Sequence, residues 1–596
     1  MLVYGDRQEP ADPGQRVREI NRELDAAERM PAGIERHARL VAALIDAGQL
    51  LQGIADADFA EHCRDRRTRA TDSLSAFLLE LGETACRSWD TEFRDTGPLP
   101  RLEPLDGLPA EVELRVPEGF AFYALYPEAY VEAARRLKIV GPIRVIGIRS
   151  IGTSLAAVVA AALGAPKFVT VRPFGDPFAR EIAVDPALER QLLEGEAHYV
   201  IVDEGPGQSG SSFGAVVDCL RQRDVPLNRI AVLPSHAGLP GAAATDERRR
   251  WWGQVQRQVG DFGNRWPALV ERWCGDLLGP IESEPQDISA GAWRRLHYAS
   301  EDEWPAVVSA WERRKFLVTA HGERFLVKFA GVGRTGEEKL AIARTLHTES
   351  FVPKPIGLVH GFLVEEWLDD PAPLPIGEKP LGEIARYLGT RARLLPATSG
   401  SGASVEELLT MARRNVALEL GDEFARELER WKAGEIERRI VRLRTDNKLD
   451  LHEWLRTASG ALLKTDALDH HQAHDLIGCQ DLAWDVAGAA VEFDLDQAEI
   501  EHLISATEHW VRREIDRDLI DFCRTAYLAF RVGQMRLGAT MIDESAEQQR
   551  LKRRGDLYAA ELQHLLESST PRLGLSPWSV ERRNEPPREH SLAPIG

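Results

Sequence analysis

Four short β-type runs alternate with helical runs between residues 140 and 235, and this alternation constrains the fold more than any other feature. The runs are IRVIGI (143–148), KFVTV (167–171), HYVIVDE (198–204) and RIAVLP (229–234). Helical sequences such as SLAAVVAAALGA and SFGAVVDCLRQRD lie between them. Strands that alternate with helices form a parallel sheet with helices on its faces, and ligands bind at the carboxyl ends of such strands. The sequence therefore predicts an α/β domain with a site at that edge.

The rest of the chain divides into segments of different texture. A length of 596 residues suggests about three or four domains. Helical periodicity predicts a helical N-terminal domain over 1–95, and the α/β domain is expected over 110–290. Near residue 296 the pattern changes to antiparallel strand candidates (RRLHYAS, KFLVTAHG, ERFLVKFAG, HGFLVEEWL), followed by helices, which predicts an α+β domain over 296–575. The Pro-rich residues 576–596 are expected to form a disordered tail.

Composition excludes several classes of function. Lys and Arg number 74 against 94 Asp and Glu, a net charge of −20, which disfavours general nucleic-acid binding. The six cysteines are scattered, without disulfide or zinc-site spacing. The first residues lack a signal-peptide pattern, and the longest apolar run, 155–165, is too short to span a bilayer. We expect a soluble cytoplasmic protein that acts on a small molecule, does not bind membranes, and allows a homodimer.

One segment, YVIVDEGPGQSGSSF (199–213), joins a buried strand, two carboxylates and a small-residue loop to a helix start. Glycines let the backbone approach a ligand, and the N–H groups of a helix start attract phosphate. Asp203 and Glu204 are costly to bury unless hydroxyl groups or a metal satisfy them. A ribose that carries a 5′-phosphate meets both demands. The alternative is an ordinary α/β turn with solvated acids.

This order resembles the phosphoribosyl pyrophosphate (PRPP) loop of type I phosphoribosyltransferases. The resemblance implies that Asp203 and Glu204 hold the ribose in the catalytic site, and that the 5′-phosphate is bound by Gly207, Gln208, Ser209, Gly210, Ser211 and Ser212. It also implies that the upstream loop binds the leaving pyrophosphate with Mg²⁺, through Arg149, Gly152, Thr153 and Ser154. Arg172 and Arg180 lie where the family has a mobile basic loop. Gln208-Ser209 departs from the usual Thr-Gly pair.

A second set of residues begins with Lys328, on the alternating strand ERFLVKF. A lysine on an apolar strand face has to find a partner or project into a cleft. Strand, helix (GEEKLAIARTLH) and two further strands follow, an order that resembles the N-terminal lobe of kinase-like phosphotransferases of the aminoglycoside phosphotransferase and choline kinase type. The resemblance implies that Lys328 holds the phosphates of ATP and that Glu338 or Glu337 orients it. It also implies a hinge at Glu365–Leu368, including Trp367, that contacts adenine.

The downstream part of the resemblance supplies carboxylates. Asp446 would accept the acceptor proton, Asp466 would bind Mg²⁺, and an Asp of the segment Asp481–Asp485 (DLAWD) would brace the catalytic loop. The family pattern places an Asn, the second metal ligand, five residues after the catalytic Asp, but position 451 is Leu. Asn447, Asp450 and His452 remain the alternatives for this ligand. The group Asp469–His474 is read as solvated or paired rather than metal-binding.

The sequence thus predicts a bifunctional enzyme that transfers a phosphoribosyl group from PRPP and phosphorylates a hydroxylated small molecule with ATP and Mg²⁺. Two alternatives remain. In the first, both pockets sense nucleotide or PRPP without reacting. In the second, only the transferase is active and the kinase-like fold is a scaffold.

Overall fold

The computed structural model describes residues 8–241, 243–369, 371–397, 401–473, 477–542 and 544–567, without the side chain of Ser545. The tail predicted for 576–596, and His474, lie outside these residues. The helices are α1 (Pro13–Arg29), α2 (Ile34–His62), α3 (Arg69–Asp90), α4 (Glu118–Phe122), α5 (Pro127–Arg135), α6 (Ile151–Ala162), α7 (Pro186–Leu193), α8 (Ser211–Arg221), α9 (Asp246–Trp252), α10 (Trp266–Leu278), α11 (Arg294–His297), α12 (Arg334–Thr348), α13 (Leu381–Leu394), α14 (Val405–Glu419), α15 (Asp422–Glu427), α16 (Ala433–Glu437), α17 (Leu482–Glu492), α18 (Gln497–Val511), α19 (Arg517–Thr540) and α20 (Ser545–Glu567).

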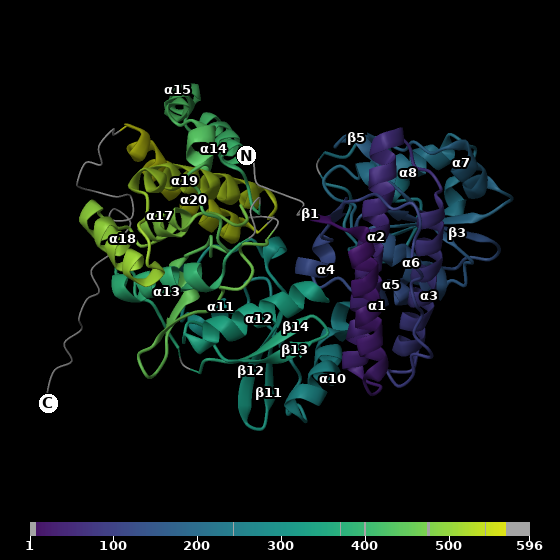
Figure 1. The fold of residues 1–596 in the computed structure, drawn as a ribbon, viewed down its shortest axis with the longest axis horizontal. Helices are drawn as coiled ribbons and strands as arrows, with labels where there is room; N and C mark the ends of the chain where they lie inside the picture. The colour runs from purple at the N-terminus through teal and green to yellow at the C-terminus, as the bar shows by residue number, and fades with distance from the viewer. Residues whose placement is uncertain are drawn as a thin grey trace.

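The strands fall into one parallel and several antiparallel sheets. They are β1 (Gln8–Ala11), β2 (Val112–Arg115), β3 (Ile143–Ile148), β4 (Phe168–Val171), β5 (Phe174–Asp176), β6 (Ala179–Glu181), β7 (His198–Val202), β8 (Ile230–Leu233), β9 (Gln256–Arg257), β10 (Gln286–Asp287), β11 (Lys315–Ala320), β12 (Glu323–Phe329), β13 (Pro355–Val359), β14 (Phe362–Glu366), β15 (Ala372–Pro373), β16 (Trp454–Arg456) and β17 (Leu462–Lys464). Figure 1 shows the N-terminal helices and the parallel sheet on the right, and the C-terminal helices on the left.

The predicted parallel sheet is confirmed. Its order is β4-β3-β7-β8-β9, and every pair is parallel. Side chains alternate between two faces: Val200 and Val202 pack toward α6, whereas Tyr199 and Ile201 pack with α8 and the tryptophans of α9. The sheet is therefore buried on both sides, as its nearly continuous apolar strands require.

The N-terminal helices cover the sheet rather than standing apart from it. α3 and α2 both pack against α6. Among the described residues, α2 is the helix whose length and hydropathy would suffice to cross a membrane, yet 78% of its most apolar stretch is buried inside the protein. Packing thus accounts for its apolar composition.

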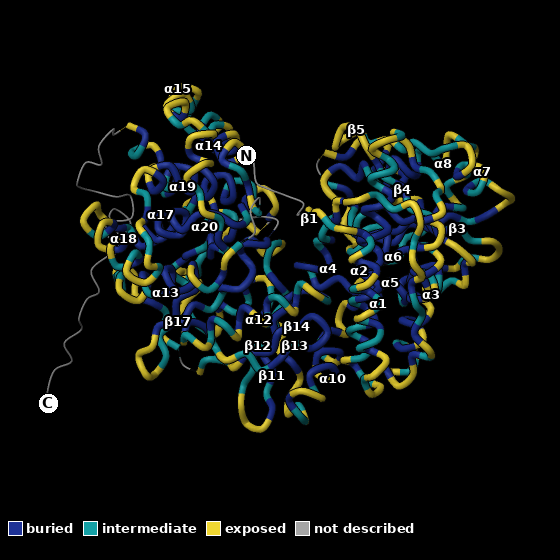
Figure 2. The backbone as a smooth tube through the Cα atoms, viewed as in Figure 1, coloured by how far each residue is buried: buried dark blue, intermediate teal, exposed yellow. Residues whose placement is uncertain are grey.

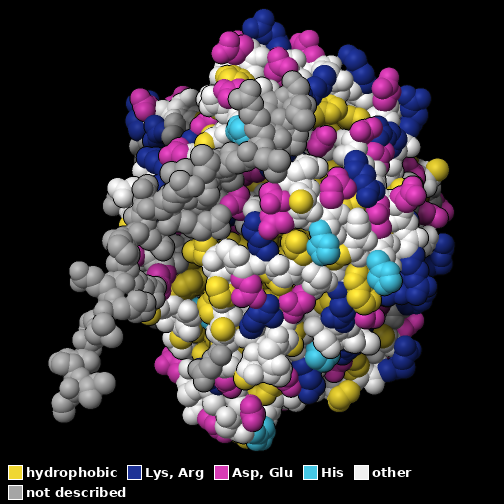
Figure 3. Space-filling model, turned by 90° about the vertical axis from the view of Figure 1, so that its left-hand side faces the viewer, with side chains coloured by type: hydrophobic (Ala, Val, Ile, Leu, Met, Phe, Trp, Pro, Cys, Tyr) yellow, Lys and Arg dark blue, Asp and Glu magenta, His cyan; other side chains and the backbone are white. Residues whose placement is uncertain are grey.

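The C-terminal half, called the kinase-like half below after the resemblance that the sequence suggests, begins with an antiparallel sheet of order β10-β11-β12-β14-β13, against which α12 packs. One expectation was wrong here: RRLHYAS does not form a strand, because residues 294–297 form α11. The C-terminal helices surround a small sheet, β15-β16-β17. On the face of the molecule that Figure 3 shows, acidic and basic side chains are interspersed.

A single apolar core connects these parts. It runs from the N-terminal helices through one face of the parallel sheet to the β11, β12 and β14 strands of the kinase-like half. α10 packs against β11 and β13, and its Trp266 and Trp273 contact the ring of Tyr126. Figure 2 shows this buried backbone in dark blue across the junction. The two candidate sites are therefore held by one packed body.

Candidate functional sites

The acidic pair lies at the carboxyl end of β7, as the sequence predicts. The Tyr130 hydroxyl donates to the Asp203 carbonyl oxygen (2.9 Å), and the backbone N–H of Gly119 donates to Glu204 Oε2 (3.2 Å). Burial raises the pKa of Asp203 to about 7, and the backbone N–H of Glu204 offsets this only in part. Hydrogen bonds from hydroxyl donors stabilise the ionised form of such a buried carboxyl group, and a sugar would supply these donors.

The loop after the acids has the left-handed turns that its glycines allow. Gly207 and Gly210 have φ of 62° and 61°, and Gly210 is the N-cap of α8. The hydroxyls of Ser209 and Ser211 both donate to the Pro177 carbonyl in the β5–β6 hairpin (3.1 and 2.6 Å). The hairpin is thus pinned onto the predicted phosphate loop.

A side-chain hydrogen bond also connects the β5–β6 hairpin to this loop. Arg180, on β6, donates to Ser212 Oγ (2.6 Å). Gly207 and Gln208 are exposed. The structure therefore places Arg180 against the loop residues 207–212. The serine hydroxyls, however, are already engaged within the protein.

The upstream loop differs from the expectation. Arg149 is buried, forms an ion pair with Asp65, and lies 3.0 Å from Asp56. Arg172 also pairs with Asp56. Burial raises the pKa of Asp65 to about 6 against the effect of Arg149. The two arginines predicted to face pyrophosphate are thus matched by aspartates of the N-terminal helical region.

The hydroxyl side chains of this loop also face inward. Thr153 and Ser154 are buried at the start of α6, and Ser154 Oγ donates to the Leu44 carbonyl of α2 (3.5 Å). Gly152 packs so closely on the sheet that an added Cβ would lie 2.6 Å from the Val202 carbonyl oxygen. We correct the prediction accordingly: Thr153 and Ser154 pack α6 against its neighbours, and Gly152 allows this approach.

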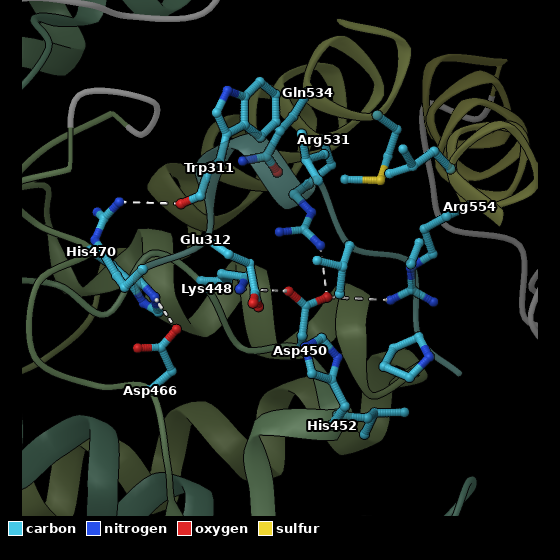
Figure 4. A pocket seen from close by; sticks show the side chains of 18 of the residues that line it. Trp311, Glu312, Lys448, Asp450, His452, Asp466, His470, Arg531, Gln534 and Arg554 are labelled. Carbon is cyan, nitrogen blue, oxygen red and sulfur yellow. Dashed lines mark hydrogen bonds and ion pairs between the residues drawn. The ribbon is translucent and has the colours of Figure 1, made fainter. Parts of the chain in front are cut away.

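The second site is a cleft in the kinase-like half that holds two adjoining cavities of about 350 and 110 Å³. Lys328 and Asp466 line both cavities and form an ion pair. Although burial opposes the charged form, Asp466 and Asp469 raise the pKa of Lys328, so the ammonium is kept. His470 Nε2 lies 3.3 Å from Asp466, and Figure 4 shows the two side chains pointing toward one another.

Glu338 does not orient Lys328, and this prediction needs correction. Glu338 instead accepts from Gln472 Nε2 (2.7 Å), and Glu337 lies 3.9 Å from Arg39. The helix does supply a partner to the cleft, because Lys339 donates to Asp469 Oδ2 (2.9 Å). The residue of this helix that contacts the cleft wall is thus Lys339, one position after the predicted Glu338.

The predicted hinge lines the smaller cavity. Glu365, Glu366, Trp367 and Leu368 all border it. Burial raises the pKa of Glu365 to about 7, and Lys328 offsets this only in part. The aromatic ring of Trp367 and the apolar wall suit a planar base, while the Lys328 end suits phosphates.

Asp446 is not on the cavity wall, and its predicted role needs correction. It is fully buried and accepts from the Tyr387 hydroxyl and from His470 Nδ1 (2.9 Å). Despite burial, Lys464 and His470 hold its pKa well below the usual range. Asp485 braces the loop, because it accepts from the backbone N–H groups of Asp446 (2.8 Å) and Asn447 (2.9 Å).

Sequence reasoning missed the two residues that face the cleft here. Glu453 lies next to Asp466, with ligand oxygens less than 4.8 Å apart, and five residues before it stands Lys448. Lys448 Nζ lies 2.5 Å from Glu453 Oε1. Five residues is also the interval that the resemblance implies between the catalytic carboxylate and the second metal ligand. One signal for Glu453 was its position directly before a strand, β16.

Of the three alternatives for the second ligand, Asn447 and Asp450 have other hydrogen-bond partners, whereas Asp450 and His452 also lie beside Glu453 in a group that could hold a metal ion. The Asn447 amide donates to the Gly478 carbonyl (2.8 Å), and Arg531 donates to Asp450 (2.7 Å). Burial lowers the pKa of His452 to about 4. Figure 4 shows Lys448, Arg531 and Arg554 around Asp450, which lines the larger cavity.

Comparisons with known proteins give structural similarity alone. No family model matches the chain, and no curated protein matches its sequence. The choline kinase LicA from Streptococcus pneumoniae is 14% identical, with a TM-score of 0.34 over 50% of this chain and 99% of that one. A Plasmodium vivax ethanolamine kinase is 13% identical, with a TM-score of 0.32 over 50% and 89% of the two chains. A type I macrolide 2′-phosphotransferase is 14% identical, with a TM-score of 0.32 over 49% and 95%.

Proposed function

We propose that the kinase-like half binds ATP and transfers its γ-phosphoryl group to a hydroxyl group of a small molecule. The observation that carries this proposal is the Lys328–Asp466 ion pair on the wall shared by two cavities, one bordered by a hinge and one open toward the C-terminal helices. The base would lie against Trp367, and Lys328 would hold the phosphates. The acceptor would occupy the larger cavity.

The residues present fit a divalent ion. Asp466 and Glu453 offer the adjacent carboxylate oxygens that Mg²⁺ prefers. When bound, Mg²⁺ neutralises charge between the β- and γ-phosphates. Since Asp446 does not line either cavity, Asp450, a carboxylate of the larger cavity 4.0 Å from Lys448, is proposed to accept the hydroxyl proton. Arg531 would keep Asp450 ionised and in place.

Calorimetry and ³¹P NMR test this proposal. Wild-type protein should bind ATP·Mg, and Lys328→Met should abolish binding. Lys354→Met is the matched control, because Lys354 is an exposed lysine that lines neither cavity. Wild-type protein that binds neither ATP nor ADP would overturn the proposal.

A second candidate activity, phosphoribosyl transfer from PRPP, rests on a separate observation. Asp203 and Glu204 end a parallel strand directly before the glycine loop at the N-terminus of α8, with Arg180 beside it. In this proposal the acids hold the ribose hydroxyls, and the loop N–H groups hold the 5′-phosphate. PRPP binding that Asp203→Asn abolishes, with pyrophosphate release in the presence of an acceptor, would support it.

The sensor alternative is favoured by Lys448, five residues before Glu453, and by the pairing of Arg149 with Asp65. The same measurements distinguish it from the enzymes. Binding of both ligands without release of ADP or pyrophosphate, even after addition of a cell extract, would assign the chain to regulation.

A further inference from the structure

Three buried side chains meet where the N-terminal helices contact the kinase-like half. They are His37 on α2, Glu128 on α5 and His360 in the turn between β13 and β14. Glu128 Oε1 lies 2.6 Å from His37 Nε2 and 2.9 Å from His360 Nε2. All three side chains are at most 2% exposed. Neither candidate site described above uses them.

Hydrogen bonding within the described residues leaves this cluster incomplete. Glu128 Oε2 and His360 Nδ1 are buried and have no partner there. The surroundings are aromatic: the His360 ring lies 4.9 Å from those of Tyr126 and Trp273, and the His37 ring 4.7 Å from that of Phe93. An unpartnered carboxylate oxygen in such surroundings is costly, so the cluster calls for a further partner.

A contact from outside the cluster orients one of the two imidazoles. His37 Nδ1 is within 2.9 Å of Ser88 Oγ, the type of outer contact that orients a metal-binding histidine.

The backbone at His360 is constrained as well. It has φ of 43°, and its carbonyl oxygen accepts from the Tyr126 hydroxyl (2.6 Å). Two-residue hairpin turns with positive φ usually carry Asn or Gly at this position. The turn and this hydrogen bond together fix the position of the His360 backbone.

We propose that His37, Glu128 and His360 bind a divalent transition-metal ion at this junction, zinc according to the donor set. Two imidazole nitrogens and a carboxylate that uses both oxygens give four donor atoms, the number that zinc prefers. The ion would satisfy Glu128 Oε2 and would leave no open position for a substrate. Its role is structural: it ties α2 and α5 to the turn of the kinase-like sheet.

Metal content of the full-length chain tests this proposal. Protein purified without chelators and dialysed against Zn²⁺-containing and then metal-free buffer should hold about one zinc per chain by inductively coupled plasma mass spectrometry. Replacement by Co²⁺ should give the intense visible absorption of a four-coordinate site. Folded wild-type protein that retains neither ion would overturn the proposal, whatever the variants do.

Two variants distinguish a metal site from simple hydrogen bonding. His360→Gln keeps an N–H that can donate to Glu128 but is a poor zinc ligand, so it should lose the ion and lower the unfolding temperature. Glu128→Gln should lose the ion too. His62→Gln, at the far end of α2, is the control and should keep it. A His360→Gln variant with wild-type stability and no change in metal content would show that the cluster is held by hydrogen bonds alone.

Discussion

The backbone N–H of Gly119 donates to Glu204 Oε2 over 3.2 Å, which connects the acidic pair to α4. The other end of this five-residue helix contacts the kinase-like half. The Phe120 carbonyl accepts from the Val332 N–H (2.9 Å), and the Ala121 carbonyl from Lys339 Nζ (3.5 Å). Lys339 also donates to Asp469, which lines the larger cavity. α4 thus contacts the acidic pair directly and is connected, through Lys339, to a residue on the wall of the larger cavity.

This connection through α4 predicts that the two ligands influence each other's affinity. We expect saturating PRPP to change the Kd for ATP by about fivefold or more, and ATP to change the Kd for PRPP by the same factor. Isothermal titration in both orders measures this. Lys339→Met should weaken the coupling, whereas Lys354→Met should leave it intact. Independent binding in wild-type protein would show that α4 transmits nothing.

Replacing Asp203 by Asn should raise the stability of the protein at high pH and abolish PRPP binding. Its pKa is raised to about 7 in the folded state, from 3.8, so ionising it disfavours folding increasingly as the pH rises from about 4 to 7. Asp203→Asn should therefore increase the free energy of unfolding at pH 8, by on the order of 1 kcal/mol, and not at pH 4. Urea titrations at both pH values check this. PRPP binding by the variant should be lost. A variant less stable at pH 8 would mean that the carboxylate has a partner in the folded state.

Structural features that depend on a local sequence pattern could be predicted from the sequence. The parallel sheet follows from strands whose side chains are apolar on both faces, and the acids of β7 follow from their place after such a strand. The position of Lys328 on β12 follows in the same way from alternation along a single strand.

Side-chain partners that come from distant segments could not be predicted. Nothing near Arg149 in the sequence indicates that Asp65, 84 residues away, neutralises it. Asp446 has the sequence context of a catalytic carboxylate, yet it is buried against Tyr387 and His470. Lys448, two residues later, lines the cavities instead. His37, Glu128 and His360 meet only because α2, α5 and the β13–β14 turn pack together.

Lys448 is expected to compete with Mg²⁺ for the Glu453 carboxylate. Its ammonium lies 2.5 Å from Glu453 Oε1, so it opposes a cation at that carboxylate. Lys448→Met should lower the Mg²⁺ concentration needed for ATP binding by about threefold to tenfold, since a partly buried charge contact is worth roughly 1 kcal/mol. Calorimetric titration of ATP over a Mg²⁺ series measures this. Lys315→Met is the control, because it removes the same charge from the same cavity but pairs with Glu312. Loss of ATP binding even without Mg²⁺ would instead show that Lys448 contacts the phosphates.

Alanine substitutions at two glycines should change the unfolding free energy in opposite directions. At Gly152 a Cβ would lie 2.6 Å from the Val202 carbonyl oxygen, a backbone atom that cannot move without shifting β7. Gly152→Ala should therefore cost about 1–3 kcal/mol of unfolding free energy. Because Asp203 directly follows Val202, the variant should also weaken PRPP binding. At Gly275, on α10, a Cβ meets no atom within 4 Å, so Gly275→Ala should stabilise the chain by up to about 1 kcal/mol through helix propensity. Thermal unfolding of both variants against wild type provides the comparison, and equal effects of the two substitutions would contradict the close packing of α6 on the sheet.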